Sequence, residues 1–245
     1  MKAKFATRFG AVLVLGLALI CEQAPAAITL VNATATIEQF DAGNSYLISR
    51  AIDGNTSSGT QGWAVFPGQG AAQTAVFQTS VLNTDAAWDF DLFFSHFATG
   101  HKIQEFRISA TTSVSPTTTS GATWTELTPF LVSGTWGGGP VTYSVTGNTV
   151  RFSGVNEPGN GPAYLAQWTM TALNPALTNV TGFRLEVFPF DDNGAGGPTL
   201  GFQTGSNNGN IVLTEFTATT APEPSRALLV GTGLIGLTFR RRRCS

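Results

Sequence analysis

The chain has 245 residues, of which 42% are hydrophobic and only 11% charged, and it contains two cysteines. Its formal net charge of −2 conceals an asymmetry, because eight of the 13 basic residues lie near the two ends. The central part keeps 5 basic and 13 acidic residues, a net charge of −8. A surface with this charge repels phosphate groups, which argues against a nucleic-acid-binding protein. Cys21 and Cys244 are also near the ends, so the central part has no disulfide framework and no cysteine metal site.

Residues 1–26 have the three parts of a secretory signal peptide. Three basic residues between positions 2 and 8 precede the apolar run from Ala11 to Ile20, and Ala24-Pro25-Ala26 offers a cleavage point near Ala26. The apolar run is shorter than the roughly 20 residues that span a bilayer. Cys21 follows the large Ile20, which does not fit a lipoprotein signal. We therefore expect this segment to direct export.

Short runs of β-branched and aromatic residues recur through the central part, separated by clusters of Gly, Asn, Pro and Ser. No helical period persists, and several runs alternate apolar and polar residues as half-buried strands do. Gly147-Asn148 predicts a tight hairpin turn. The pattern predicts an all-β, two-sheet sandwich of about eight strands in one domain. The predicted strands are 73–79, 87–94, 104–111, 141–146, 149–152, 164–171, 182–188 and 210–218.

Several segments of the central part, in this order, are similar to one known family. They are Arg50-Ala51-Ile52-Asp53-Gly54-Asn55-Thr56 with Gly62-Trp63-Ala64, then 74–77, 103–109, 182–187 and 209–216. Together residues 28–219 resemble a divergent bacterial form of the coagulation factor 5/8 type C (discoidin, galactose-binding-like) domain. The resemblance implies an eight-stranded jelly-roll β-sandwich whose N- and C-terminal strands are adjacent. It also implies a binding module rather than an enzyme, since many relatives bind carbohydrate.

The same resemblance implies one structural Ca²⁺. In carbohydrate-binding relatives this ion is held by the A-I-D-G-N loop and by a glutamate near the last strand. The matching residues here are Asp53 and Glu215, with Asn55 and backbone oxygens of the loop as further ligands. Calcium takes six to eight hard oxygen ligands, which carboxylates and carbonyls supply. In the alternative interpretation Asp53 only begins a turn, and Glu215 pairs with a buried arginine, Arg107 or Arg184.

Aromatic residues are candidates for stacking on a sugar ring. Trp63 occupies the position of a core tryptophan in the family. Trp136 precedes the run 137–140 of three glycines and a proline, so we expect it on an exposed loop, where it can bind a ligand by stacking. Core packing is the alternative for Trp136. His96 and His101 match no zinc-binding spacing, and we expect ordinary loop histidines.

A hydrolase would need a pair of carboxylates, for which Asp89, Asp91, Glu105 and Glu157 are the candidates. Asp89 and Asp91 alternate within one predicted strand and so share a face. The chain contains no G-x-S-x-G, H-E-x-x-H or phosphate-loop motif. We therefore expect no catalytic activity.

Residues 221–245 combine three features: the triplet Pro222-Glu223-Pro224, the uncharged run 227–239, and the cluster Arg240, Arg241, Arg242 and Arg243. Arginines are costly to move into hydrocarbon and stay on the cytoplasmic side of a membrane. This order resembles the PEP-CTERM sorting signal of Gram-negative surface proteins, which an exosortase processes. As a helix the run would reach about 20 Å, short of the roughly 30 Å hydrocarbon core, so it predicts a weak and transient membrane anchor.

The sequence thus predicts an exported protein, first anchored in the inner membrane and then located at the cell surface or in the extracellular matrix. Its central part is expected to bind carbohydrate, such as an exopolysaccharide, and not nucleic acid. Two alternatives belong to other classes. One is a structural, glycosylated matrix protein without a specific ligand, and the other is a jelly-roll hydrolase or lyase.

Overall fold

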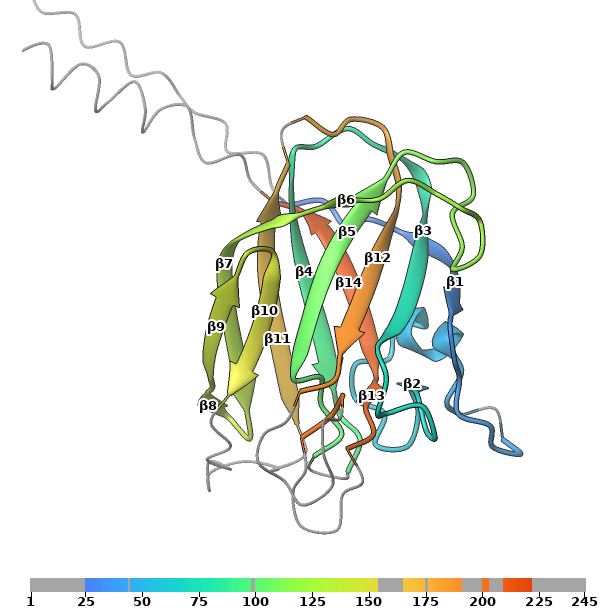
Figure 1. The fold of residues 1–245 in the computed structure, drawn as a ribbon, viewed down its shortest axis with the longest axis vertical. Helices are drawn as coiled ribbons and strands as arrows, with labels where there is room; N and C mark the ends of the chain where they lie inside the picture. Colours follow the sequence, from blue (N-terminus) through green and yellow to red (C-terminus); the bar gives the residue numbers. More distant parts are fainter. Residues whose placement is uncertain are drawn as a thin grey trace, which may run out of the picture. The chain divides into compact units, whose positions relative to one another are not determined.

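A computed structural model describes residues 25–43, 45–97, 100–153, 165–174, 176–190, 200–202 and 209–221. These residues form antiparallel strands and one short 3-10 helix, η1 (Ile48–Ile52) (Figure 1). The strands are β1 (Leu30–Ala35), β2 (Trp63–Ala64), β3 (Gln73–Asn83), β4 (Ala87–Phe94), β5 (Glu105–Thr111), β6 (Thr125–Glu126), β7 (Thr128–Trp136), β8 (Gly139–Pro140), β9 (Thr142–Thr146), β10 (Thr149–Ser153), β11 (Ala166–Leu173), β12 (Val180–Phe188), β13 (Val212–Leu213) and β14 (Glu215–Thr220).

Two large sheets pack face to face. The seven-stranded sheet has the order β1-β3-β12-β5-β10-β9, with β6 paired to β5, and the five-stranded sheet has the order β14-β4-β11-β7-β8. The strands β2 and β13 form a small third sheet. In Figure 1 the seven-stranded sheet lies in front and the five-stranded sheet behind it. The prediction of an all-β sandwich is confirmed.

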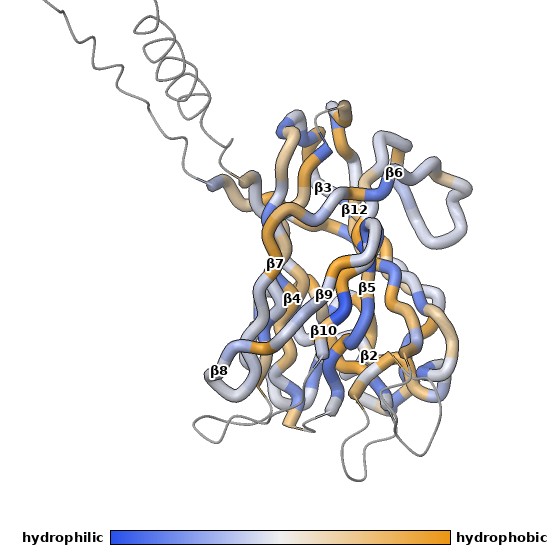
Figure 2. The backbone as a smooth tube through the Cα atoms, turned by 60° about the vertical axis from the view of Figure 1, so that its left-hand side comes forward, coloured by the Kyte–Doolittle hydropathy of each residue, from blue (hydrophilic) through white to orange (hydrophobic). Residues whose placement is uncertain are grey.

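The core lies between the two large sheets and is built from alternate residues of each strand. In β4 the residues Trp88, Phe90, Leu92 and Phe94 are buried, while the residues between them are partly exposed. Figure 2 shows this alternation of hydrophobic and hydrophilic residues along the strands. Aromatic side chains join the sheets, since the ring of Phe90 meets that of Phe183 in β12 edge to face at 5.0 Å. Such contacts add to the stabilisation from buried apolar area.

The first and last described segments meet at one end of the sandwich. Ala27 pairs with Thr219 of β14, and the backbone N–H of Ile28 donates to the carbonyl of Ala218 at 2.9 Å. The chain then leaves this edge of the five-stranded sheet and continues as β1 at the edge of the other sheet. The segment that leads into β1 thus lies beside the C-terminal strand β14, whereas β1 itself pairs with β3 in the other sheet.

All eight predicted strand regions contain strands, with ends shifted by a few residues. The sequence pattern missed β1, β7 and the two-residue strands β2, β6 and β8. It also placed Trp136 on a loop, which is wrong, because Trp136 is the last residue of β7. β7 contains Pro129 and Gly134, which usually argue against a strand. Pro129 lies beside an irregularity in the pairing of β7 with β11, where a missing N–H is tolerated.

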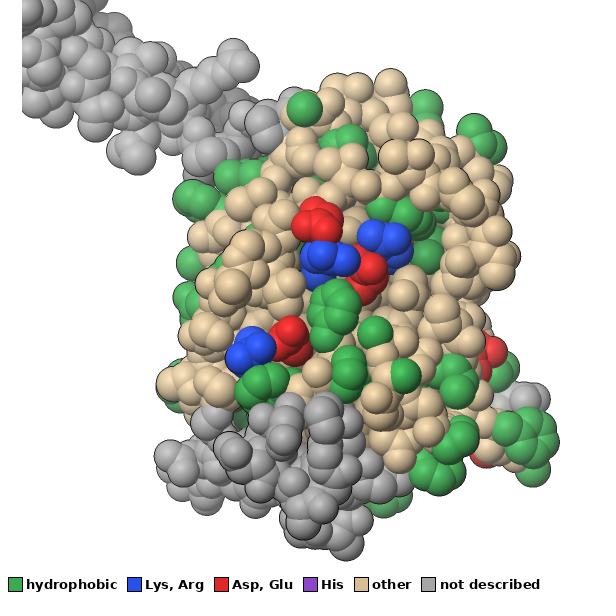
Figure 3. All heavy atoms as spheres, in the orientation of Figure 1, with side chains coloured by type: hydrophobic (Ala, Val, Ile, Leu, Met, Phe, Trp, Pro, Cys, Tyr) green, Lys and Arg blue, Asp and Glu red, His purple; other side chains and the backbone are tan. Residues whose placement is uncertain are grey.

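Ion pairs occupy the outer face of the seven-stranded sheet. Arg107 contacts Glu126 at 2.5 Å and Glu186 at 3.0 Å, and Arg184 contacts Glu186 at 3.0 Å. Figure 3 shows these acidic and basic side chains gathered on the face toward the viewer. Arg107 and Arg184 thus have acidic partners on their own sheet, and Glu215 is not one of them.

The predicted signal peptide, apart from Pro25 and Ala26, lies outside the described residues, as do Pro222-Glu223-Pro224, the run 227–239 and the arginine cluster 240–243. Within the described ranges, no helix has the length and apolar character needed to cross a membrane.

Candidate functional site

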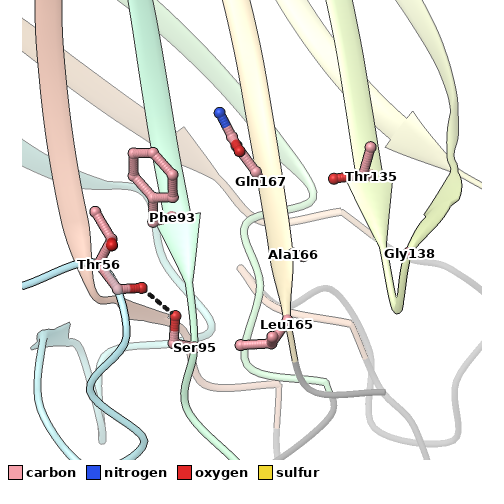
Figure 4. Close-up of a pocket in the computed structure, with 8 residues that line it drawn as sticks. All are labelled: Thr56, Phe93, Ser95, Thr135, Gly138, Leu165, Ala166 and Gln167. Carbon is pink, nitrogen blue, oxygen red and sulfur yellow. Dashed lines mark hydrogen bonds between the residues drawn. The ribbon is translucent and has the colours of Figure 1, made fainter. Parts of the chain in front are cut away.

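A pocket of about 330 Å³ opens on the outer face of the five-stranded sheet, near the end remote from the chain's first and last described segments. Four elements contribute to it: β4, β11, the β7–β8 region and the loop after η1 (Figure 4). The lining residues are Thr56, Phe93, Ser95, Thr135, Gly138, Leu165, Ala166 and Gln167.

The sheet register explains why these side chains meet. Phe93 of β4 pairs with Gln167 of β11, and Gln167 pairs with Thr135 of β7, so the three form one row across the sheet. Directly paired residues point to the same face. In β4 the residues on either side of Phe93 are buried, which turns the Phe93 ring outward. Figure 4 shows the Phe93 ring and the Gln167 amide from neighbouring strands at the wall of the pocket.

The loop after η1 is tied to the sheet at the pocket. The Ser95 hydroxyl donates to the backbone carbonyl of Thr56, and the backbone N–H of Ser95 donates to the Thr214 hydroxyl at 2.9 Å. Ser95 is buried, whereas Thr56 is exposed. These bonds hold one wall of the pocket in place by polar contacts.

Polar side chains continue from the pocket along the outer face of the sheet. The Gln167 amide nitrogen donates to Asp91 Oδ1 at 2.9 Å, and the Thr169 hydroxyl donates to the same oxygen at 2.7 Å. Thr171 donates to Asp89 Oδ1 at 2.5 Å. The prediction that Asp89 and Asp91 share a face is confirmed. Because Nε2 of Gln167 already binds Asp91, the orientation of the amide at the pocket is fixed.

The other carboxylates considered for hydrolysis are elsewhere. Glu105 lies in β5 of the seven-stranded sheet and accepts a hydrogen bond from Arg151 Nε at 2.5 Å. Glu157 lies outside the described residues. Among the described residues, the pocket lining contains no carboxylate, imidazole or thiol. Its groups can therefore bind a ligand by hydrogen bonds and by contact with a phenyl ring, without offering an acid or a base.

Glu215 of β14 lies against the loop that contains Asp53. The backbone N–H of Gly54 donates to Glu215 Oε2 at 3.1 Å, and Glu215 is only 4% exposed. The pKa of Glu215 is raised to about 7, mainly because the carboxyl group is buried and also because of the negative charge of Asp53, while N–H groups of the loop partly offset both effects. A carboxyl group is thus buried beside a second carboxyl group, an arrangement that a bound cation would stabilise.

The residues at this loop fit a calcium ion in their chemistry. Asp53 and Glu215 supply carboxylate oxygens, and the loop supplies backbone carbonyls. In the structure, Asp53 accepts a hydrogen bond from the N–H of Asn55 at 3.0 Å and lies 3.7 Å from Arg50. Asn55 accepts from the N–H of Ser57 at 3.2 Å. No group of three His, Cys, Asp or Glu side chains suited to a metal occurs in the described part, so backbone oxygens would have to complete the site. Calcium binding remains a prediction.

Trp136 does not line this pocket and is 1% exposed. Its ring packs against Phe202 with 5.1 Å between centroids, and the Lys102 ammonium lies 4.6 Å from the ring centroid. The expectation of an exposed stacking surface is wrong, because β7 extends to this residue and its alternation turns the indole into the core. Trp63 is buried as expected, and its Nε1 donates to the carbonyl of Ile37 at 2.8 Å.

The two histidines contact each other. Nδ1 of His96 lies 3.2 Å from Nδ1 of His101, and Nε2 of His96 lies 3.4 Å from the Tyr46 hydroxyl. Burial, together with the smaller effects of the nearby His101 and Lys102, lowers the pKa of His96 to about 4. His96 is therefore neutral at pH 7, and the prediction of loop histidines missed this contact.

Sequence reasoning missed the residues that line the pocket. The signal for Phe93 was present, because it is the large apolar residue on the face of β4 that otherwise carries Asp89 and Asp91. Gln167 and Thr135 carried no such signal, since their meeting depends on the order β4-β11-β7 within the sheet.

Comparisons with known proteins give similarity only at the level of structure. No family model matches the chain, and no curated protein matches its sequence. A family 32 carbohydrate-binding module of NanJ from Clostridium perfringens, in complex with galactose, is similar over 80% of this chain and 98% of its own, with 14% identity and a TM-score of 0.43.

Two further modules of family 32 are similar to this chain. The C. perfringens module CpGH89CBM32-5, in complex with GalNAc-β-1,3-galactose, has 16% identity, covers 79% of this chain and 99% of its own, and gives a TM-score of 0.41. The module of EndoD from Streptococcus pneumoniae has 12% identity, covers 79% and 98% of the two chains, and also gives a TM-score of 0.41.

Proposed function

We propose that the protein is a non-catalytic carbohydrate-binding module that is exported to the cell surface or the extracellular matrix. The observation that carries this proposal is the pocket around Phe93, Thr135 and Gln167. It combines one aromatic ring with hydroxyl and amide groups on a rigid sheet. A sugar ring presents C–H groups on its faces and hydroxyls at its rim, and this lining can contact both.

The size and chemistry of the pocket favour a small, neutral and polar ligand. Its volume of about 330 Å³ lies at the lower end of the range for ligand sites, which suits a single sugar unit at the end or side of a polymer. The lining residues that the structure describes include no Lys, Arg, Asp or Glu, so they offer no charge to select an ionic ligand. Leu165 adds an apolar contact at the rim.

Binding can be tested with a glycan array and with the exopolysaccharide of the producing cell, each in the presence and absence of calcium. Galactose and N-acetylgalactosamine are suitable first probes for calorimetry. We expect Phe93→Ala to weaken binding at least about tenfold, corresponding to about 1.4 kcal/mol, and Gln167→Ala to weaken it similarly. Phe40→Ala is the matched control, because Phe40 is 89% exposed and does not line the pocket.

Two results would contradict the proposal. One is the absence of saturable binding to any glycan or polysaccharide with or without calcium. The other is equal affinity of the Phe93→Ala and Phe40→Ala variants. Thermal unfolding of each variant separates loss of binding from loss of fold.

We propose further that the signal peptide directs export and that an exosortase processes the C-terminal signal after transient anchoring in the inner membrane of a Gram-negative bacterium. The support is the sequence of both ends, in particular Pro222-Glu223-Pro224 and the arginines 240–243. Mass spectrometry of the protein recovered from the cell surface tests this. We expect a chain beginning near Ala27 and lacking the arginine cluster, and recovery of the intact chain would contradict the proposal.

A further inference from the structure

β9 is an edge strand that lacks the usual protection against pairing. One side of β9 forms a ladder with β10 from Thr142 to Thr146, and no strand of the described part pairs with its other side. All five residues of β9 are exposed, and none is charged or proline. Soluble proteins usually block such an edge with Lys, Pro or a bulge. In Figure 1 β9 lies at the left margin of the front sheet.

The hairpin register identifies the backbone groups that face outward. A two-residue turn joins β9 to β10, and Thr146 pairs with Thr149, so that pair exchanges both backbone hydrogen bonds. Bonding then alternates along an antiparallel ladder. Ser144 bonds to β10 like Thr146, whereas the N–H and C=O groups of Tyr143 and Val145 point away from it.

A contact at the start of the strand supports this assignment. The N–H of Val141, which has the same parity as Tyr143 and Val145, donates to the carbonyl of Gly134 in β7 at 2.9 Å. The odd-numbered residues therefore direct their N–H groups to the side opposite β10. In the described part, β7 takes up this donation only at Val141, where the two sheets meet.

The side chains of Tyr143 and Val145 are also incompletely covered. They pair with the buried residues Phe152 and Val150 of β10, so they lie on the core side of the sheet. At this edge they nevertheless remain 44% and 42% exposed. The Tyr143 ring packs on Phe152 from one side, with 6.1 Å between centroids. Beyond the approach of β7 near the start of the strand, no strand of the described part pairs with the outer side of β9, and its two apolar side chains stay partly uncovered.

We propose that β9 pairs antiparallel with β9 of a second copy of this chain, about a two-fold axis at Ser144. In this register Ser144 faces its own symmetry mate, Tyr143 faces Val145 of the partner subunit, and Thr142 faces Thr146 of the partner subunit. The outward backbone groups of Tyr143 and Val145 then bond to each other across the axis. The seven-stranded sheet continues into the second molecule.

The segment Thr-Tyr-Ser-Val-Thr is what points to a second copy as the partner, because it is complementary to itself. Its hydroxyl residues meet hydroxyl residues, and its aromatic residue meets its β-branched residue, a favourable cross-strand combination. No charge on the strand repels its mate. An isologous contact of this kind closes as a dimer.

One strand pair is small beside the roughly 1,600 Å² of a standard interface, so we expect a weak, concentration-dependent dimer. When several copies are bound to one polymer, the pairing of their β9 strands becomes intramolecular. Weak pairing then adds to the overall affinity for the polymer. The dimer does not depend on the sugar pocket, since β9 contributes no residue to that lining.

Disulfide trapping tests the register. The full chain, with Cys21→Ser and Cys244→Ser to remove its own thiols, carries either Ser144→Cys or the matched control Thr142→Cys. Non-hydrogen-bonded pairs have Cα atoms about 4.5 Å apart, within the range of a disulfide. We expect Ser144→Cys to form a covalent dimer at least about tenfold faster, since Thr142 faces a different residue of the partner. Equal rates for the two variants would overturn the proposal.

Sedimentation over a micromolar to millimolar concentration series tests the pairing itself. Val145→Pro removes an outward N–H that β10 does not use, and we expect it to raise the dimer dissociation constant at least about tenfold. Val145→Lys tests the same edge by charge if the proline variant unfolds, which circular dichroism would reveal. A wild-type chain that stays monomeric throughout the series, or variants that associate like it, would overturn the proposal.

Discussion

The carboxyl group of Glu215 is buried, so its ionisation costs free energy. It belongs to β14 on the same row as Phe93, yet the loop after η1 covers it and gives it the N–H of Gly54. The family resemblance in the sequence predicts that this carboxyl group is a calcium ligand. The same burial has two consequences, one for pH dependence and one for metal binding.

Without metal, the pKa of about 7 for Glu215, against an ordinary 4.5, predicts a dependence of stability on pH. The folded state binds the proton more tightly than the unfolded state. This stabilisation is fully present below about pH 4.5 and is lost as the pH rises through about 7. In a chelator, urea unfolding of the full chain should show wild type losing on the order of 1–3 kcal/mol relative to Glu215→Gln between pH 5 and pH 8.

Asp85→Asn is the control for this series, because Asp85 precedes β4 at the opposite end of the strand from Phe93. Its difference from wild type should not follow the pattern of Glu215→Gln. If Glu215→Gln and wild type run parallel across the pH range, the carboxyl group is charged in the folded state and the expected linkage is absent.

Calcium should stabilise the full chain at pH 7. A site that binds only the folded state adds about 2.7 kcal/mol when the ion is at a hundred times its dissociation constant. We expect millimolar Ca²⁺ to raise the melting temperature, and Asp53→Asn and Glu215→Gln each to abolish most of that rise. Asp85→Asn should retain it. An unchanged melting temperature of wild type on calcium addition would show that the carboxyl pair has another role.

Among the elements, β7 contains a glycine that packing requires although glycine is unfavourable in strands. Gly134 lies inside β7, two residues before its end, and glycine within a strand usually weakens it. A Cβ atom there would lie 2.5 Å from Phe152 and 2.9 Å from Trp168. The rings of Phe152 and Trp168 stack with centroids 4.3 Å apart and fill the space a side chain would take. Glycine lets the stacked pair approach the backbone.

Gly134→Ala should therefore destabilise the protein by about 1–3 kcal/mol through overpacking. Gly70→Ala is the matched control, because a Cβ atom there meets nothing within 4 Å and Gly70 is exposed. Urea unfolding of both variants measures the difference. Similar stabilities would mean that the aromatic pair can shift to accept a methyl group at no cost.

How far the sequence could predict the fold differs from element to element. β4, β9, β10 and β12 carry enough alternation and β-branched residues to be located from the sequence, and Gly147-Asn148 marks the hairpin correctly. β1 and β7 were missed because their signals are tertiary: β1 is only partly buried, and β7 depends on neighbours that accommodate Pro129 and Gly134. The residues of a segment indicate whether it can form a strand, but they do not indicate which strand it pairs with.

The candidate site follows the same division. The proximity of Asp53 and Glu215 was predicted from the resemblance to known domains. Such a resemblance indicates which residues far apart in the sequence lie together, whereas the periodicity of apolar residues does not. The pocket was not predicted, since Phe93, Gln167 and Thr135 are neighbours only through the order of three strands. Trp136 was misplaced because a glycine-rich segment after it suggested a loop, whereas only the turn beyond β7 is glycine-rich.

For the whole molecule, the distribution of charge and the position of the ends set how it can be displayed. Three of the five basic residues of the central part form ion pairs on one sheet face, while the described residues of the pocket lining are uncharged. The first and last described segments leave from one end of the sandwich, and the pocket lies toward the other.

The strand β14 connects these two ends directly. It runs from Glu215, beside Phe93, to Thr220, beside Trp88, a rise of about 17 Å. If a polymer pulls on the pocket while the chain is held beyond Thr220, the force runs along β14 and β4. The hydrogen bonds between them lie across that direction, so they share the load and must break together instead of one after another. The two strands are thus loaded in shear. Strands loaded in this way resist a pulling force far better than a hairpin whose hydrogen bonds are opened one by one from its end.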